Sequence, residues 1–205
     1  MEKIEKTQIV DNSYFSIGFP EKKWDELISR ENIISKIEDS FNTCSLIYIE
    51  GEEDSGKTTL SAQFTKKNIK NTISVFFNPL NNLDYQKEFY CTNFVNQVRN
   101  ILKDETVISD WENLVSIEEH QKIEFQLRKR YKNKNEKIYL VVDGLGDVIN
   151  EKPDFVKSIL SIMPIGQDFF RIILTGSKKD FEKLDINLKK LRHTILVSMG
   201  SQKQN

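Results

Sequence analysis

The chain has 205 residues, of which 38% are hydrophobic and 30% are charged, which suits one globular domain with its own core. Its 30 basic and 31 acidic residues give a formal net charge of -1, so bulk charge favours neither nucleic-acid nor membrane binding. Cys44 and Cys91 lack the spacing of a disulfide framework or a zinc site. We therefore expect both thiols to be reduced. The sequence has no apolar run of membrane-spanning length, and its N-terminus has no signal-peptide core. Together these features predict a cytoplasmic protein.

The first part of the chain is predicted to be an arm followed by a helix. Residues 1–20 are mixed in polarity and end in a Gly-Phe-Pro loop signal, so we expect an N-terminal arm or linker there. Apolar residues then recur with helical spacing, which predicts a helix at about 30–41 with a turn or shorter helix before it. We expect the domain itself to span residues 21–200 and a tail to occupy 201–205.

The rest of the chain alternates short apolar runs with helical patterns. Strands are expected at 45–50, 72–77, 137–142, 170–175 and 194–198, and helices at about 57–69, 84–103, 117–131, 153–163 and 180–184. The segment 111–115 fits neither pattern. Alternation of this kind is typical of the α/β class, here a three-layer sandwich on a parallel five-stranded sheet.

The run Gly51-Glu52-Glu53-Asp54-Ser55-Gly56-Lys57-Thr58 matches the P-loop pattern G-x-x-x-x-G-K-[ST] between an expected strand and an expected helix. Its glycines let the backbone approach a phosphate, and its N–H groups with the helix N-terminus form an anion nest. Lys57 would place its charge on the β- and γ-phosphates, and the Thr58 hydroxyl would ligate Mg²⁺. With the adjoining Thr59, this loop predicts a site for ATP or ADP with magnesium.

Three carboxylates stand inside that loop. Glu52, Glu53 and Asp54 can point to solvent while the backbone binds the phosphates. Their charge should nonetheless weaken the long-range attraction of a nucleotide.

Two further strand ends carry candidate groups. Asp143 ends the apolar run 138–142, which is the Walker B pattern and would hold magnesium through a water. The pattern is weak alone but specific about 85 residues after a P-loop. Thr175, Ser177 and Lys178 follow the strand at 170–175 and are candidates for sensing the γ-phosphate, although an ordinary turn with a serine cap explains them as well.

Three stretches carry a family resemblance: Arg30-Glu31-Asn32-Ile33-Ile34, Asp143-Gly144-Leu145-Gly146-Asp147 and Leu174-Thr175-Gly176-Ser177-Lys178. They resemble the Arg-Glu helix start, the D-G-L-D-E extension and the T-S-R sensor strand of STAND-class NTPases, which include NACHT domains, plant-resistance-type domains and bacterial antiviral sensors. The resemblance covers roughly residues 20–198 and implies the strand order 5-1-4-3-2.

The resemblance also implies roles for single residues. Asp147 would polarise the attacking water, Lys178 would stand near the sensor arginine, and Arg30 would lie near the adenine side. Asp147 is shorter than the usual glutamate and Gly146 replaces the preceding acid, so we expect slow hydrolysis. Lys178 can supply charge but not a planar bidentate contact.

Members of the class act as switches that ADP holds closed and that ATP drives into oligomers. They continue into a helical lid and a winged helix, whereas this sequence stops at Asn205. We therefore expect an excised domain or a longer natural chain, whose partners are other domains or further copies. The leading hypothesis is a regulatory ATPase module of a STAND-type signalling or antiviral defence protein.

Other functions remain open at this level. A module that holds nucleotide without hydrolysing it is one, because Asp147 is a poor match for the usual glutamate. A small P-loop kinase is another, although no cluster of arginines has the pattern of a lid. A DNA-handling AAA-type ATPase would need a basic surface. The basic run at 128–134 is interpreted more simply as a solvated helix end.

Overall fold

The computed structural model describes residues 29–77, 86–103, 114–184 and 194–199, and structural statements below refer to these ranges. The expected arm at 1–20, the tail at 201–205 and most of the segment 111–115 lie outside them.

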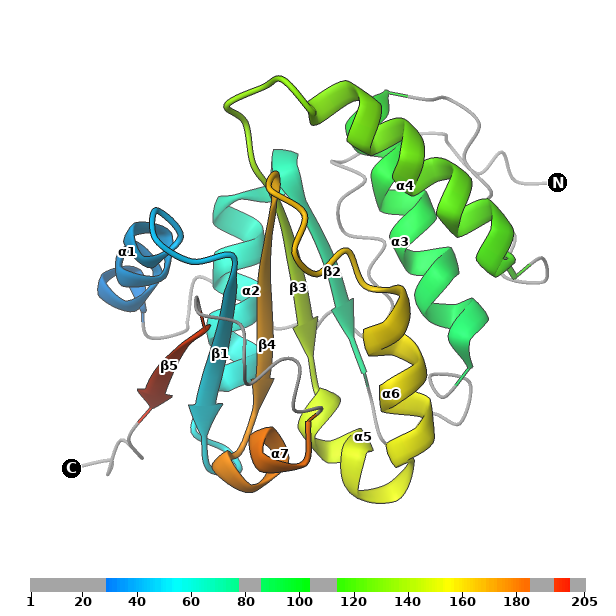
Figure 1. The fold of residues 1–205 in the computed structure, drawn as a ribbon. Helices are drawn as coiled ribbons and strands as arrows, with labels where there is room; N and C mark the ends of the chain where they lie inside the picture. Colours follow the sequence, from blue (N-terminus) through cyan, green and yellow to red (C-terminus); the bar gives the residue numbers. More distant parts are fainter. Residues whose placement is uncertain (1–28, 78–85, 104–113, 185–193, 200–205) are drawn as a thin grey trace, which may run out of the picture.

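Helices and strands alternate along the described chain (Figure 1). They are α1 (Glu31–Ser40), β1 (Leu46–Gly51), α2 (Lys57–Lys67), a short 3-10 helix (Ile69–Asn71), β2 (Thr72–Phe76), α3 (Lys87–Leu102), α4 (Ile117–Tyr131), β3 (Ile138–Asp143), α5 (Leu145–Glu151), α6 (Pro153–Ile162), β4 (Phe170–Gly176), α7 (Lys178–Lys183) and β5 (Thr194–Met199). The predicted α/β class is confirmed.

The strands form one parallel sheet in the order β2-β3-β4-β1-β5. In the ladder between β1 and β4, Glu50 lies beside Gly176, and between β2 and β3, Phe76 lies beside Asp143. The carboxyl ends of β1, β3 and β4 therefore meet at one edge of the sheet, where ligands of open α/β sheets bind.

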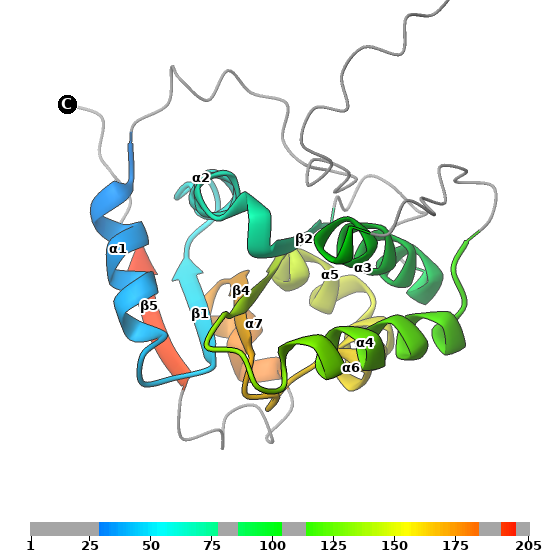
Figure 2. The same cartoon turned by 90° about the horizontal axis from the view of Figure 1, so that it is seen from above.

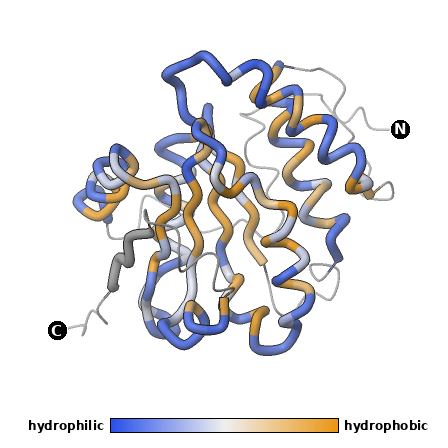
Figure 3. Tube along the Cα trace, viewed as in Figure 1, coloured by the Kyte–Doolittle hydropathy of each residue, from blue (hydrophilic) through white to orange (hydrophobic). Residues whose placement is uncertain are grey.

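Two hydrophobic layers cover the two faces of the sheet, because successive strand side chains point to opposite sides. Leu46 and Tyr48 of β1 belong to the larger layer, which is formed with α3, α4, α5 and α6. Ile47 and Ile49 belong to the smaller one, formed with α1 and α2. Figure 2 shows α2 and α4 on opposite sides of the sheet, and Figure 3 shows the central strands as the most hydrophobic part of the fold.

The structure adds a helix that the sequence pattern did not predict, α5. It follows Gly144, which has a φ of 80°, and it contains Gly146. Glycine at these positions weakens the helical signal, since it is a poor helix former. Helix α7 also begins earlier than expected, because Ser177 and Asp180 form a reciprocal capping box at its start.

Both cysteines are buried and unpaired, and burial raises the pKa of the Cys91 thiol to about 12. In the described ranges, no helix combines the length and apolarity needed to cross a bilayer.

Candidate nucleotide-binding site

The glycine loop, residues 51–58, turns the chain from the end of β1 into the start of α2. Two of its residues, Asp54 and Gly56, have positive φ values of 55° and 88°. Aspartate tolerates that region, but Gly56 is further restricted because a Cβ built on it would lie 2.2 Å from Nη2 of Arg30. The loop thus curls tightly in front of the N-terminus of α2, which is the geometry of an anion-binding nest.

The Lys57 ammonium lies over this loop. Its Nζ donates hydrogen bonds to the carbonyl oxygens of Gly51, at 2.8 Å, and of Glu52, at 2.6 Å. The charge is therefore held at the mouth of the loop by groups that a phosphate could replace.

Asp143 is the centre of a hydroxyl cluster at the end of β3. Its Oδ2 accepts a hydrogen bond from Thr58 at 2.7 Å, and its Oδ1 accepts from Thr175 at 2.8 Å and from Ser61 at 3.1 Å. The residue is only 4% exposed. Burial raises the pKa of the carboxyl group, and the hydrogen bonds from Thr58, Thr175 and Ser61 and the charge of Lys57 oppose that rise.

The pair Thr58 and Asp143 fits a magnesium ion. Both offer oxygen ligands, and their oxygens lie 2.7 Å apart at the open side of the loop. Mg²⁺ is usually held by one or two such protein oxygens together with waters and phosphate oxygens. Ser61 and Thr175 would orient the carboxylate beside the ion.

These groups line a pocket of about 320 Å³ at the carboxyl edge of the sheet. Its lining residues are Gly51, Glu52, Glu53, Lys57, Thr58, Asp143, Gly144, Gly146, Asp147, Asn150, Thr175, Gly176, Ser177, Lys179, Asp180 and Lys183. The structure therefore brings Lys57 to the same pocket as Asp143 and Asp147, which lie far from it in the sequence.

The predicted sensor residues have different surroundings. The Thr175 hydroxyl bonds to Asp143 and accepts from the Gly144 N–H at 3.2 Å. The Ser177 hydroxyl accepts from the Asp180 N–H and caps α7. Lys178 is exposed and is not a lining residue, whereas Lys179 and Lys183 are. This pair was not among the predicted site residues, because the helix was expected to begin at 180; on the observed α7 the i, i+4 spacing places both lysines on one face.

Asp147 occupies an exposed position on α5 at the pocket. Desolvation by the surrounding protein raises the pKa of its carboxyl group, which the charge of Lys57 counteracts and the charge of Asp180 reinforces. The neighbouring Gly146 packs closely, since a Cβ there would lie 2.6 Å from Oδ2 of Asp180. The same Cβ would lie 2.9 Å from the Cα of Gly176, so the close approach of two backbone segments requires glycine at 146.

The remaining loop residues lie around the pocket. Glu52, Glu53 and Asp54 are exposed, which agrees with side chains that face solvent. Ser55 is buried, and Thr59 is partly buried on the first turn of α2. Neither lines the pocket, nor does Arg30, whose guanidinium bonds to the Ser55 carbonyl oxygen at 3.2 Å.

A cavity of equal volume, about 320 Å³, lies at the amino ends of the strands. Its cations Lys137 and Arg171 donate to backbone carbonyls, those of Asp168 and Phe41 among them. The chain forms no glycine loop or helix N-terminus among the residues that line it. The carboxyl edge is therefore the better candidate for a nucleotide.

Comparison with known proteins gives a likeness in structure alone. No protein-family model and no curated protein matches the sequence. Among solved structures, the chain is similar to Drosophila ORC bound to DNA, with 17% identity over 82% of this chain and 41% of that one and a TM-score of 0.50. It is also similar to Cdc6p from Pyrobaculum aerophilum (12% identity, 88% and 48% covered, TM-score 0.48) and to PCH-2 from C. elegans (12%, 86% and 45%, TM-score 0.39).

The chain thus spans less than half the length of each of these proteins. At 17% identity, the likeness to the ORC structure concerns the fold. With the parallel sheet and its order of strands, it identifies a P-loop NTPase fold.

Proposed function

We propose that the chain binds ATP or ADP with magnesium at the glycine loop and hydrolyses ATP slowly. The direct hydrogen bond from Thr58 to Asp143, 2.7 Å long, is the observation that carries the proposal. It joins the start of α2 to the end of β3, and it supports the proposal because a hydroxyl and a carboxylate that lie so close together could share one magnesium ion.

Each group then has a defined task. The loop N–H groups and the N-terminus of α2 hold the phosphates. The Lys57 ammonium moves from the Gly51 and Glu52 carbonyls onto phosphate oxygens, and Thr58 and Asp143 hold magnesium, which neutralises phosphate charge when bound. Lys179 and Lys183 add positive charge to the lining of the pocket, where they offset the acidic loop residues.

Asp147 is the residue proposed to orient water. A carboxylate whose pKa is raised is a better base near neutral pH, and desolvation raises the pKa of Asp147. Its exposed position and its short side chain favour slow turnover over fast turnover.

A nucleotide-holding module without turnover is the second candidate. The exposure of Asp147 favours it, because a water held there would exchange freely with solvent. A kinase is less well supported, since no arginine lines the pocket in the described part of the chain.

We further propose that the chain is a STAND-type switch module of a signalling or antiviral defence protein, in which nucleotide controls association with other domains or copies. The strand order, β5-β1-β4-β3-β2 when counted from β5, supports this assignment. Arg30 also supports it, because this residue stands at the start of α1, and α1 is the helix that precedes β1 and the glycine loop.

Two binding measurements and one kinetic measurement test the proposal. Isothermal titration of the purified chain with ATP and ADP, with and without Mg²⁺, should give saturable binding that the metal strengthens. Steady-state phosphate release should be slow, and Asp147→Asn should lower it without weakening ATP binding. Equal phosphate release by wild type and Asp147→Asn would contradict a hydrolytic role and favour the module that holds nucleotide without turnover. Failure to bind either nucleotide would contradict the proposal as a whole.

A further inference from the structure

Arg30 contacts the glycine loop at the peptide between Ser55 and Gly56. It is the N-cap residue of α1, yet its side chain makes no capping hydrogen bond. Instead, its Nη2 donates to the Ser55 carbonyl oxygen at 3.2 Å. The guanidinium also packs against Gly56, since a Cβ at that position would come within 2.2 Å of Nη2 and 2.9 Å of Cζ.

This contact fixes one peptide group of the loop. The carbonyl of Ser55 and the N–H of Gly56 belong to the same planar trans peptide, so they point in opposite directions. Holding the carbonyl toward Arg30 therefore directs the Gly56 N–H away from Arg30. Arg30 can thus orient one of the backbone donors of the loop.

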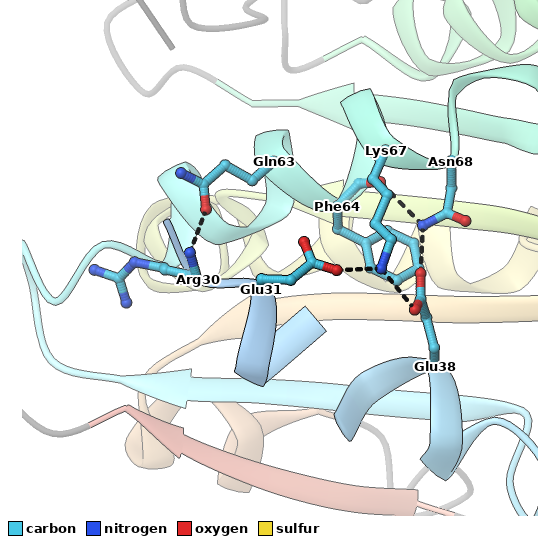
Figure 4. Close-up of polar contacts among 7 residues, drawn as sticks. All are labelled: Arg30, Glu31, Glu38, Gln63, Phe64, Lys67 and Asn68. Carbon is cyan, nitrogen blue, oxygen red and sulfur yellow. Dashed lines mark hydrogen bonds and ion pairs between the residues drawn. The ribbon is translucent and has the colours of Figure 1, made fainter. Parts of the chain in front are cut away.

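Helix α1 is itself held against α2, as Figure 4 shows. We call the contacts among Glu31, Glu38, Lys67 and Asn68 the α1–α2 clamp. Lys67 Nζ bonds to Glu31 at 2.5 Å and to Glu38 at 2.9 Å, and Asn68 donates to Glu38 at 3.0 Å. Hydrogen bonds to Glu31 and Glu38 raise the pKa of the Lys67 ammonium.

Two further contacts attach the start of α1 to the same helix. The Arg30 backbone N–H donates to Oε1 of Gln63 at 3.2 Å. Beneath the clamp, the Phe41 ring packs on Phe64 with centroids 6.4 Å apart. Because α2 begins at the glycine loop, these contacts keep Arg30 in register with the peptide that it holds.

We infer that Arg30 is a positioning residue for phosphate binding: it presets the Ser55–Gly56 peptide and so prepares the loop to receive a polyphosphate of any nucleotide. The inference rests on the proposed function for its consequence in binding, but the preset loop itself exists without ligand. Its positive charge also lies next to a loop with three exposed carboxylates, Glu52, Glu53 and Asp54. It therefore opposes their repulsion of an anion.

A residue that acts through the loop and one that touches the base differ in what they recognise. Loss of Arg30 as a loop-positioning residue weakens ATP, ADP, GTP and inorganic tripolyphosphate by one common factor. Loss of an adenine contact weakens ATP and ADP and leaves tripolyphosphate unchanged.

The experiment compares wild type, Arg30→Ala and Arg30→Lys by titration with ATP, ADP and GTP and by displacement of a fluorescent ATP analogue with tripolyphosphate. We expect Arg30→Ala to weaken all four by about tenfold, as for a lost charge-assisted hydrogen bond. Arg30→Lys should recover part of this, because an ammonium can still donate to Ser55. Lys122→Ala serves as the control and should bind all four as wild type does, because Lys122 is exposed on α4 and lies far from the loop and the clamp.

A second readout needs no nucleotide. In free Arg30→Ala, amide hydrogen exchange at Ser55, whose N–H donates to the Glu52 carbonyl at 3.2 Å within the loop, should speed up, while exchange in α3 and α4 stays as in wild type. Weakening of ATP and ADP alone, or unchanged exchange at Ser55, would overturn the inference. Absence of binding by wild type with faster Ser55 exchange in the variant would instead contradict only the proposed function.

Discussion

The two faces of the sheet are held in different ways. On the face of α3, α4, α5 and α6, a large apolar layer includes fully buried rings such as Tyr90, Phe94 and Phe170. On the face of α1 and α2, the apolar layer is smaller, and polar contacts add to it at both ends of α2. Arg30 and Asp143 bond near the start of that helix, and Lys67 bonds near its end.

This difference separates stability from recognition. Buried apolar area dominates folding free energy, so the larger layer should carry most of the stability. Exposed ion pairs such as the α1–α2 clamp contribute little to the folding free energy. They do, however, fix how α1 is oriented against α2. We therefore expect substitutions on the first face to unfold the protein and substitutions on the second to change what it binds.

Removing a ring from the larger layer should have the largest effect. Phe94 is fully buried and packs on His120, with centroids 4.5 Å apart, and on Phe170 at 6.3 Å. Phe94→Ala should lower the free energy of unfolding by about 3–5 kcal/mol, measured by urea denaturation, and leave the ATP affinity of the folded fraction unchanged. Phe125→Ala, at an exposed ring on α4, is the control and should cost less than about 0.5 kcal/mol.

A pH dependence of stability should also come from the larger layer. His120 is fully buried, and neither of its ring nitrogens has a hydrogen-bond partner among the described residues. Burial lowers the pKa of the imidazole from 6.5 to about 4. The unfolded chain therefore binds this proton first, so stability is intact above about pH 6.5 and falls as the pH drops toward 4.

The loss over that window should be on the order of 3 kcal/mol. His120→Phe should remove this part of the pH dependence, as urea denaturation at a series of pH values would show. An identical pH profile in both proteins would mean that folding does not lower the pKa of His120.

On the second face, the hydroxyl cluster around Asp143 should affect binding more than stability. Thr175→Val keeps the shape of the side chain but removes its hydrogen bond to Asp143 and the acceptor for the Gly144 N–H. We expect a stability loss of about 1–2 kcal/mol and a reduced gain in ATP affinity on adding Mg²⁺. A magnesium effect equal to that of wild type would show that Thr175 does not orient the carboxylate.

The smallest effect should distinguish neighbouring lysines of α7. Lys179→Ala should weaken ATP binding a few-fold, because Lys179 lines the pocket and an exposed charge contributes up to about 1 kcal/mol. Lys178→Ala should change it less, since Lys178 is exposed and does not line the pocket. A larger loss of ATP affinity in Lys178→Ala than in Lys179→Ala would instead favour Lys178, the residue that the family resemblance indicates.

The features that could be predicted from the sequence are those with a local signal. The alternation of β-rich runs with helical patterns indicated the α/β fold. The loop at 51–58 and Asp143 could be found because each follows a strongly apolar run. Such signals depend only on residues that are neighbours in the sequence.

Contacts across the fold could not be predicted in this way. Ser61 reaches Asp143 because α2 packs beneath β3, and Lys179 reaches the pocket because Ser177 caps the start of α7. The contact of the Arg30 guanidinium with the Ser55 carbonyl likewise joins residues that are 25 positions apart in the sequence. Each contact depends on how separate elements pack, which their own sequence pattern does not encode.

Above all, we propose that the glycine loop binds a magnesium nucleotide through Lys57. Titration of Mg-ATP into wild type, Lys57→Ala and the control Lys122→Ala, an exposed lysine on α4, tests it directly. We predict saturable binding to wild type and to Lys122→Ala, and a loss of about 100-fold or more in Lys57→Ala at unchanged melting temperature. Equal affinity of a folded Lys57→Ala variant and wild type would contradict the account.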